Sequence, residues 1–132
     1  MEATRSVNLV CYLAHDYDEA IAFFVGKMGF ELVEDQDRGE GKRWVVVRAG
    51  SAGVELVIVK ACTSASKAAV GKQTGDEVGF FLQTDDFMRD YEKWAAAGVK
   101  FREAPRHEVY GIVSVFEDLY GNGWDLIQRP EA

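Results

Sequence analysis

The chain repeats one order of elements twice, and this internal repeat constrains its fold more than any other feature of the sequence. Each copy begins with a short apolar run, continues through a segment that an aspartate can cap and a glycine can close, and ends in three further apolar runs. Corresponding positions lie 69 or 70 residues apart, at Asp16 and Asp85, Gly29 and Gly98, Phe30 and Val99, and Glu55 and Asp125. A fixed lag of this length predicts two copies of one structural module.

Each copy is predicted to have the order β-α-β-β-β. In the first copy we expect strands at residues 7–14, 30–34, 43–48 and 54–60, with a helix from about residue 16 to residue 29. In the second copy we expect strands at residues 78–84, 99–103, 109–117 and 124–128, with a helix from residue 85 to about residue 97. Residues 35–42 are charged and contain glycine, which predicts a hairpin loop.

The predicted organisation is a first module at residues 1–60, a linker at 61–76 with room for a helical turn, and a second module at 77–132. A module of this size cannot bury the face of its own sheet, so the two copies must share one core. The expected fold is therefore α+β, with two tandem βαβββ modules forming a curved eight-stranded mixed sheet around a cavity. At 132 residues the chain fits one structural domain overall.

Charge and hydropathy exclude several kinds of partner. The formal net charge is −7 and the chain has no basic run, which argues against binding to nucleic acids or to anionic membrane surfaces. No apolar run approaches the roughly 18 residues that a membrane span needs, and no signal peptide follows Met1, so we expect a cytoplasmic protein. Cys11 and Cys62 are then expected to be thiols, because disulfides are rare in that compartment.

The stretch at residues 118–128 joins a turn signal to a short apolar run. Asn-Gly at residues 122 and 123 predicts a reversal of the chain there, because both residue types tolerate positive φ. On the strand that follows, Asp125 faces opposite to Trp124 and Leu126, since side chains alternate along a strand. A carboxylate at that place either meets solvent or points into a cavity.

Four segments together, residues 16–35, 43–47, 97–99 and 118–128, resemble the vicinal oxygen chelate superfamily, which includes glyoxalase I, the bleomycin-resistance proteins and the extradiol dioxygenases. The resemblance covers nearly the whole chain apart from the linker. It implies the paired βαβββ modules described above and a homodimer. It does not fix the chemistry, because the superfamily holds lyases, dioxygenases and drug-sequestering proteins that have no catalytic activity.

In metal-dependent members of this superfamily the ligands come from the first and last strands of each half. The corresponding positions here are Leu9, Gly79, Glu55 and Asp125, and the first two have no side chain that can bind a metal. No cofactor is therefore predicted, although two carboxylates with water leave a weakly held divalent metal open. The two histidines are not expected to be metal ligands, since His15 lies at a strand-to-helix junction and His107 lies in a predicted loop.

Without imidazole ligands, Glu55 and Asp125 are expected to form the floor of an acidic pocket. The candidate aromatic walls of that pocket are Trp44, Phe81, Tyr110 and Trp124. The alternative is that the aromatic rings pack in the core and that the carboxylates face solvent or pair with arginines. If both carboxylates were buried near each other, one pKa would rise and the two would form a possible acid/base pair.

The leading hypothesis is a homodimeric protein of the bleomycin-resistance type that binds a small aromatic or cationic molecule, which would make antibiotic resistance its role. The rival hypothesis is an enzyme, either a glyoxalase I-like lyase or a dioxygenase, with a metal site away from the usual positions that recruits His107 across the dimer. The third hypothesis is that the protein acts only as an interaction scaffold.

Overall fold

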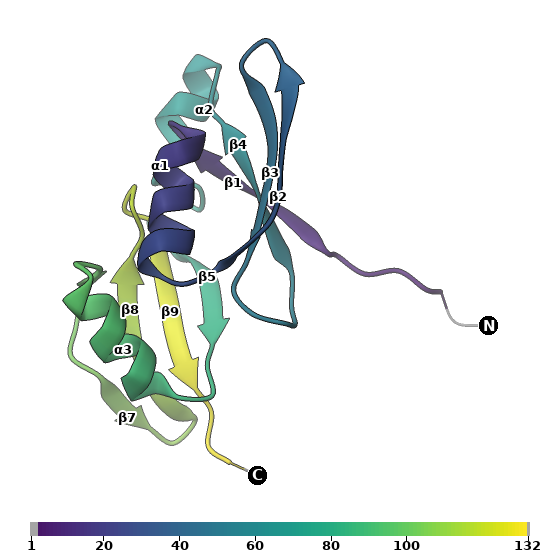
Figure 1. Cartoon of the computed structure of the whole chain (residues 1–132). Helices are drawn as coiled ribbons and strands as arrows, with labels where there is room; N and C mark the ends of the chain where they lie inside the picture. The colour runs from purple at the N-terminus through teal and green to yellow at the C-terminus, as the bar shows by residue number, and fades with distance from the viewer. Residues whose placement is uncertain (1–2, 132) are drawn as a thin grey trace. The chain divides into compact units, whose positions relative to one another are not determined.

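The computed structural model describes residues 3–131, and the chain divides after Thr63 into two units that are described separately (Figure 1). Unit 1 contains β1 (Leu9–Ala14), α1 (Tyr17–Ile21), the π-helical segment η1 (Ala22–Lys27), β2 (Glu31–Gly39), β3 (Lys42–Arg48) and β4 (Glu55–Lys60). Unit 2 contains α2 (Ser64–Ala69), β5 (Val78–Gln83), α3 (Phe87–Ala96), β6 (Lys100–Phe101), β7 (Arg106–Glu108), β8 (Gly111–Glu117) and β9 (Gly123–Gln128). The predicted α+β class and the two βαβββ-like modules are confirmed, with the strands arranged in two mixed sheets.

The sheet of unit 1 has the strand order β1-β4-β3-β2, in which β1 and β4 are parallel and the other pairs are antiparallel. Helix α1 is capped by Asp16, whose carboxylate accepts a hydrogen bond of 2.9 Å from the backbone N–H of Glu19. The helix packs against β3 and β4 (Figure 1). The core beneath it includes Tyr12 and Phe24, whose rings meet edge to face with centroids 4.9 Å apart.

The sheet of unit 2 has the order β5-β9-β8-β6, and β7 also pairs with β8. Helix α3 is capped by Asp86, which accepts a hydrogen bond of 3.1 Å from the N–H of Arg89. The helix lies against β9 (Figure 1) and buries Phe87 and Trp94. Gly98 follows it with a positive φ of 94°, a left-handed conformation that suits glycine after a helix.

The hairpin of unit 1 differs from the predicted loop at residues 35–42. Strand β2 continues to Gly39, and the turn consists of Glu40 and Gly41, with φ angles of 56° and 78°. Two consecutive positive φ angles are those of a type I′ hairpin turn. The prediction was wrong because β2 is an edge strand exposed at all nine residues, where charged side chains are compatible with pairing. Charge alone therefore does not mark a loop here.

The connection between β8 and β9 also differs from the predicted turn at residues 122 and 123. Residues 118–122 make the connection, and Gly121 has the positive φ, of 99°. The reversal depends on Asp118, whose Oδ1 accepts hydrogen bonds of 3.0–3.1 Å from the N–H groups of Tyr120, Gly121 and Asn122. A carboxylate six residues before Trp124 thus organises the connection, which the Asn-Gly signal did not reveal. Sequence patterns also missed the short strand β7, while α2 is the helical turn in the linker.

Candidate ligand-binding site

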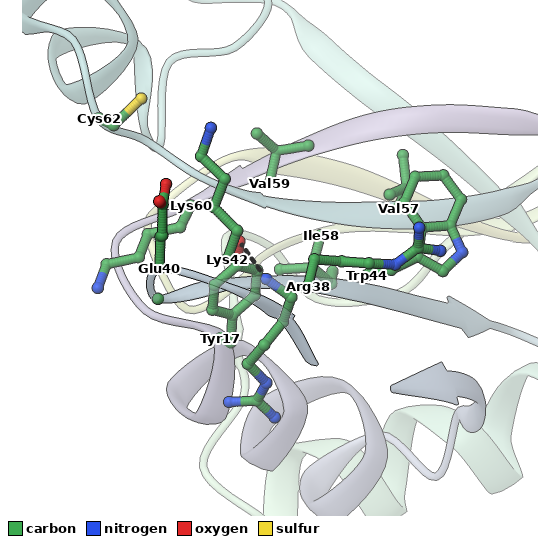
Figure 2. Close-up of a pocket in the computed structure, with 12 residues that line it drawn as sticks. Tyr17, Arg38, Glu40, Lys42, Trp44, Val57, Ile58, Val59, Lys60 and Cys62 are labelled. Carbon is green, nitrogen blue, oxygen red and sulfur yellow. Dashed lines mark hydrogen bonds between the residues drawn. The ribbon is translucent and has the colours of Figure 1, made fainter. Parts of the chain in front are cut away.

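A pocket opens in unit 1 where β3 separates from β4. Strand β3 pairs with β4 over Val45–Val47, but it pairs with β2 as far as Lys42, which lies opposite Gly39. Residues 42–44 therefore remain paired with β2 but not with β4, and a pocket of about 550 Å³ lies beside them (Figure 2). The pocket is a consequence of strand register, since the long β2–β3 hairpin continues where the β3–β4 pairing has ended.

One part of the pocket wall is apolar. Val57 and Val59 line it from β4, where they alternate with Leu56 and Ile58 of the core. Trp44 lines it from β3 (Figure 2), and its indole Nε1 donates a hydrogen bond of 2.9 Å to Glu34 Oε2. This bond fixes the orientation of the indole. The pocket therefore has an aliphatic surface and an oriented aromatic ring against which a planar molecule can pack.

The charged part of the wall is predominantly cationic. It contains Arg38, Lys42, Arg43 and Lys60, together with one carboxylate, Glu40. The guanidinium carbon of Arg38 lies 5.7 Å from the centre of the Trp44 ring. Sequence patterns did not predict these cations, because residues 38, 42 and 60 lie on three different strands and line one pocket only through the arrangement of the sheet.

Arg43 joins helix α1 to the hairpin at the edge of this pocket. Its guanidinium contacts Asp35 at 2.7 Å and Asp18 at 2.8 Å, and it lies 5.2 Å from the centre of the Tyr17 ring. The hydrogen bonds that the Arg43 guanidinium donates to Asp35, and to a smaller extent the one to Asp18, raise the pKa of Arg43 above its ordinary value. The backbone N–H of Arg43 also donates to the Tyr17 hydroxyl at 3.2 Å. The charge of Arg43 is therefore already balanced, and its role is to hold the hairpin.

Glu55 lies on the same sheet face as Trp44 but outside the pocket. It begins β4, where it is opposite Leu9 of β1, and it is partly exposed. Its Oε2 lies 3.7 Å from Arg48 Nη1. The carboxylate is thus placed beside a cation on the open face of the sheet, as one of the sequence alternatives expected.

In unit 2, Asp125 of β9 lies opposite Phe81 of β5 and shares its sheet face. Phe81 is 72% exposed, so this face of the sheet is open within the unit. Burial raises the pKa of Asp125, while the positive charge of Arg106 lowers that pKa and the negative charge of Glu103 raises it further. Tyr110 is half-exposed and lies in the turn before β8, where it hydrogen-bonds to Arg106.

Trp124 lies on the opposite face from Asp125, in the core of unit 2. It is 4% exposed, and its ring stacks on Phe80 and Phe116 at centroid distances of 4.4 and 5.7 Å. Its Nε1 donates to Asp118 at 2.9 Å. The side chains of consecutive strand residues point to opposite faces, so the ring and the neighbouring carboxylate do not line one surface.

The four positions that hold the metal in metal-dependent relatives do not fit a divalent ion. Leu9 and Gly79 have no donor atom, and Gly79 lies at an irregularity in the pairing of β5 with β9. Glu55 has the guanidinium of Arg48 beside it, and the charge of Arg106 acts on Asp125. Across residues 3–131, no three or more His, Cys, Asp or Glu side chains are grouped closely enough to hold a metal ion. His15 and His107 are both exposed.

The sequence matches the model of one known family. The model of the Glyoxalase/Bleomycin resistance protein/Dioxygenase superfamily matches residues 6–126. The chain therefore belongs to this superfamily, as the sequence resemblance predicted.

The proteins to which the chain is similar include one relative by sequence and two proteins with solved structures. An uncharacterized protein of Shewanella frigidimarina is 47% identical over 126 residues, which cover 94% of this chain and 93% of the relative. TnmS3, an antibiotic binding protein from Streptomyces sp. CB03234, is similar with a TM-score of 0.80 and 28% identity, covering 98% of this chain and all of TnmS3. UcmS2 has a TM-score of 0.80 and 27% identity, covering 95% of this chain and 98% of UcmS2.

Two further expectations concern the thiols and the membrane. Cys11 and Cys62 are thiols, and neither takes part in a disulfide within residues 3–131. Cys62 lines the pocket, and burial raises the pKa of the Cys11 thiol. None of the helices in the described part of the chain has the length and apolar character of a membrane span.

Proposed function

We propose that this protein binds a small aromatic organic molecule in the pocket of unit 1, without a metal. The observation that carries the proposal is the oriented ring of Trp44 above the aliphatic surface of Val57 and Val59, in a pocket of about 550 Å³. Ligand pockets for small organic molecules commonly measure roughly 300–1,000 Å³ and are mostly apolar, with a few polar groups. Membership of the superfamily and the similarity to TnmS3, an antibiotic binding protein, support the proposal.

The carboxylates predicted from sequence take secondary places in this proposal. Glu55 shares the sheet face of Trp44 and extends the ligand surface beyond the pocket. Phe81, Tyr110 and Asp125 form the candidate surface of unit 2, where an exposed ring lies opposite a partly buried carboxylate. No observation favours a lyase or a dioxygenase: the donor set at the usual metal positions does not fit a metal, and elsewhere within residues 3–131 no three His, Cys, Asp or Glu side chains are grouped closely enough to hold one.

A homodimer is also part of the proposal. The edge strand β2 exposes Leu32 and Val33 along a strand whose nine residues are all accessible. An accessible edge strand is a natural site for association with another chain. Light scattering after gel filtration should give a mass of about twice 14.7 kDa, and a mass of one chain at micromolar concentration would contradict a dimer.

Thermal unfolding in the presence of aromatic antibiotics and simpler aromatic compounds tests the binding function. We expect a ligand to raise the melting temperature of the natural protein and of W44F, which keeps an aromatic ring, and to lose most of this effect with W44A. The melting temperature of each variant without ligand is the control for folding. The proposal is wrong if W44A is stabilised by ligand as strongly as the natural protein, or if no compound stabilises the natural protein.

A further inference from the structure

We infer that the molecule held by the pocket of unit 1 is an anion with an aromatic body, such as an aromatic carboxylate or phenolate. This inference rests on the binding function proposed above and adds the charge of the ligand. The observation behind it is a group of three cationic side chains, Arg38, Lys42 and Lys60, at a pocket with an apolar wall. We call this group the cationic rim.

The cationic rim is not balanced by the protein itself. Arg43, the fourth cation of the wall, is held by two carboxylates, those of Asp35 and Asp18, which more than balance its charge. Among residues 3–131, the three members of the rim form no salt bridge, and the wall contains one carboxylate, Glu40. The side chains that line the pocket thus include more cations than carboxylates, in a chain whose net charge is −7, and the carboxylate of Glu34 beside them accepts the hydrogen bond of the Trp44 indole. A cationic ligand would be repelled by the rim, whereas an anion would be attracted to it.

The positions of these side chains fit one orientation of such a ligand. Figure 2 shows Trp44 with Arg38 at the Val57 end of the pocket, and Lys60 with Glu40 at the Cys62 end. An aromatic body that packs on Trp44 and Val57 would direct its anionic group along Val59 toward Lys60. Arg38 would add a second cation beside the ring, where a guanidinium can stack on an aromatic ligand.

The cationic ligand considered from sequence depended on Glu55 and Asp125 as the floor of one pocket. Glu55 lies outside the pocket of unit 1 and has Arg48 beside it, and Asp125 belongs to unit 2. The charged residues that do line this pocket are four cations and one carboxylate, Glu40. The sign of the expected ligand charge therefore reverses for this site.

Three probes of one shape separate the charge of the ligand from its aromatic body. They are 2-naphthoate, 2-naphthamide and 2-naphthylmethylammonium, titrated by calorimetry at low ionic strength. We expect 2-naphthoate to bind roughly tenfold more tightly than the amide, the size expected of one charge-assisted hydrogen bond, and the ammonium to bind most weakly. Added salt should reduce the advantage of the carboxylate, because the rim is exposed to solvent.

The variant K42M/K60M tests whether the rim is the cause. It should bring the affinity for 2-naphthoate to within about threefold of the amide, since the charge-assisted contacts would be gone. The variant K27M/K93M makes the same change of charge at exposed lysines outside the pocket and should keep the full preference. K42Q/K60Q repeats the charge change with polar side chains if the methionines cause aggregation.

The outcomes distinguish this inference from the binding function. If the ammonium binds most tightly, or if K42M/K60M keeps the preference for 2-naphthoate, the ligand is not selected as an anion by the rim. Equal binding of all three probes, abolished by W44A, would overturn the inference and leave the binding function intact. If none of the probes binds at millimolar concentration, the inference is wrong for this pocket, and the thermal unfolding experiment with other aromatic compounds decides the binding function separately.

Discussion

Replacing Asp118 with alanine tests the account of how the β8–β9 connection is held. The Asp118 carboxylate is 6% exposed and accepts five hydrogen bonds. Its Oδ1 accepts from three consecutive backbone N–H groups, and its Oδ2 accepts from Asn122 Nδ2 at 3.0 Å and from Trp124 Nε1 at 2.9 Å. The D118A variant removes both oxygens and leaves these donors in a largely buried place.

The expected loss of stability follows from the donors that would be left without an acceptor. Three of them are buried, namely the backbone N–H and side-chain Nδ2 of Asn122 and the indole Nε1 of Trp124. The N–H of Gly121 keeps its bond to the backbone carbonyl of Asp118. At about 1–2 kcal/mol for each buried donor, reduced by water that enters the space, D118A should lose about 3–5 kcal/mol. That is a large part of the roughly 5–15 kcal/mol that stabilises a typical domain.

Urea unfolding followed by circular dichroism and by tryptophan fluorescence measures this loss. D118N keeps the shape and one acceptor oxygen, but its amide would face the two donors that Oδ2 now binds, so it should also be destabilised. D76A is the control, because Asp76 is an exposed aspartate of unit 2 and surface substitutions usually change stability by about 0.5 kcal/mol or less. A loss below about 1 kcal/mol for D118A relative to D76A would refute the reasoning, since the expected cost of leaving buried donors without an acceptor would then be absent.

Three further predictions concern single residues. D125N should raise the melting temperature at pH 7: burial raises the pKa of Asp125, so ionisation costs stability as pH rises above the unfolded value of about 3.9. Scanning fluorimetry of D125N and the natural protein from pH 4 to 7 checks that this gain shrinks toward pH 4. A melting temperature of D125N below that of the natural protein at pH 7 would show that the attraction of Arg106 for the carboxylate outweighs the cost of burial. E40N should stabilise by about 0.5–1 kcal/mol in urea unfolding, because asparagine tolerates the φ of 56° better; an unchanged or lower midpoint would contradict this. R43M should lose about 1–2 kcal/mol by the same assay through the lost contacts to Asp35 and Asp18, and R43K should recover only part of it; full recovery would show that paired hydrogen bonding is unimportant.

Local signals in the sequence were sufficient to predict helices α1 and α3 and the order of the elements apart from β7. Asp16 and Asp86 cap the two helices through their carboxylates, and Gly29 and Gly98 follow the helices with φ angles of 76° and 94°. Such features depend on residues three or four positions apart, so a sequence pattern can contain all the information they need. The same patterns cannot give the length of β2, because an edge strand tolerates the charges that are also common in loops.

The candidate site could be predicted only in part, because it depends on which strands meet and where they separate. Alternation along β4 places Val57 and Val59 on the face of Glu55, and alternation along β9 places Trp124 opposite to Asp125, so both could be deduced from sequence. The cationic rim could not, since its members come from β2, β3 and β4 and meet through long-range register. Local patterns contain no information about register between distant strands.

The two modules repeat a topology but differ in register, and this difference accounts for the place of the pocket in unit 1. In unit 2, β8 and β9 remain paired from Ile112 opposite Gln128 to Glu117 opposite Gly123, and the connection held by Asp118 keeps their ends together. In unit 1, β3 pairs with β4 over three residues only and then follows β2 into the longer hairpin. A pocket needs neighbouring strands that diverge while each keeps another partner for its backbone. The longer hairpin of the first module meets this condition, because β2 still pairs with the backbone of β3 where β4 no longer does. The space between β3 and β4 then becomes available to a ligand.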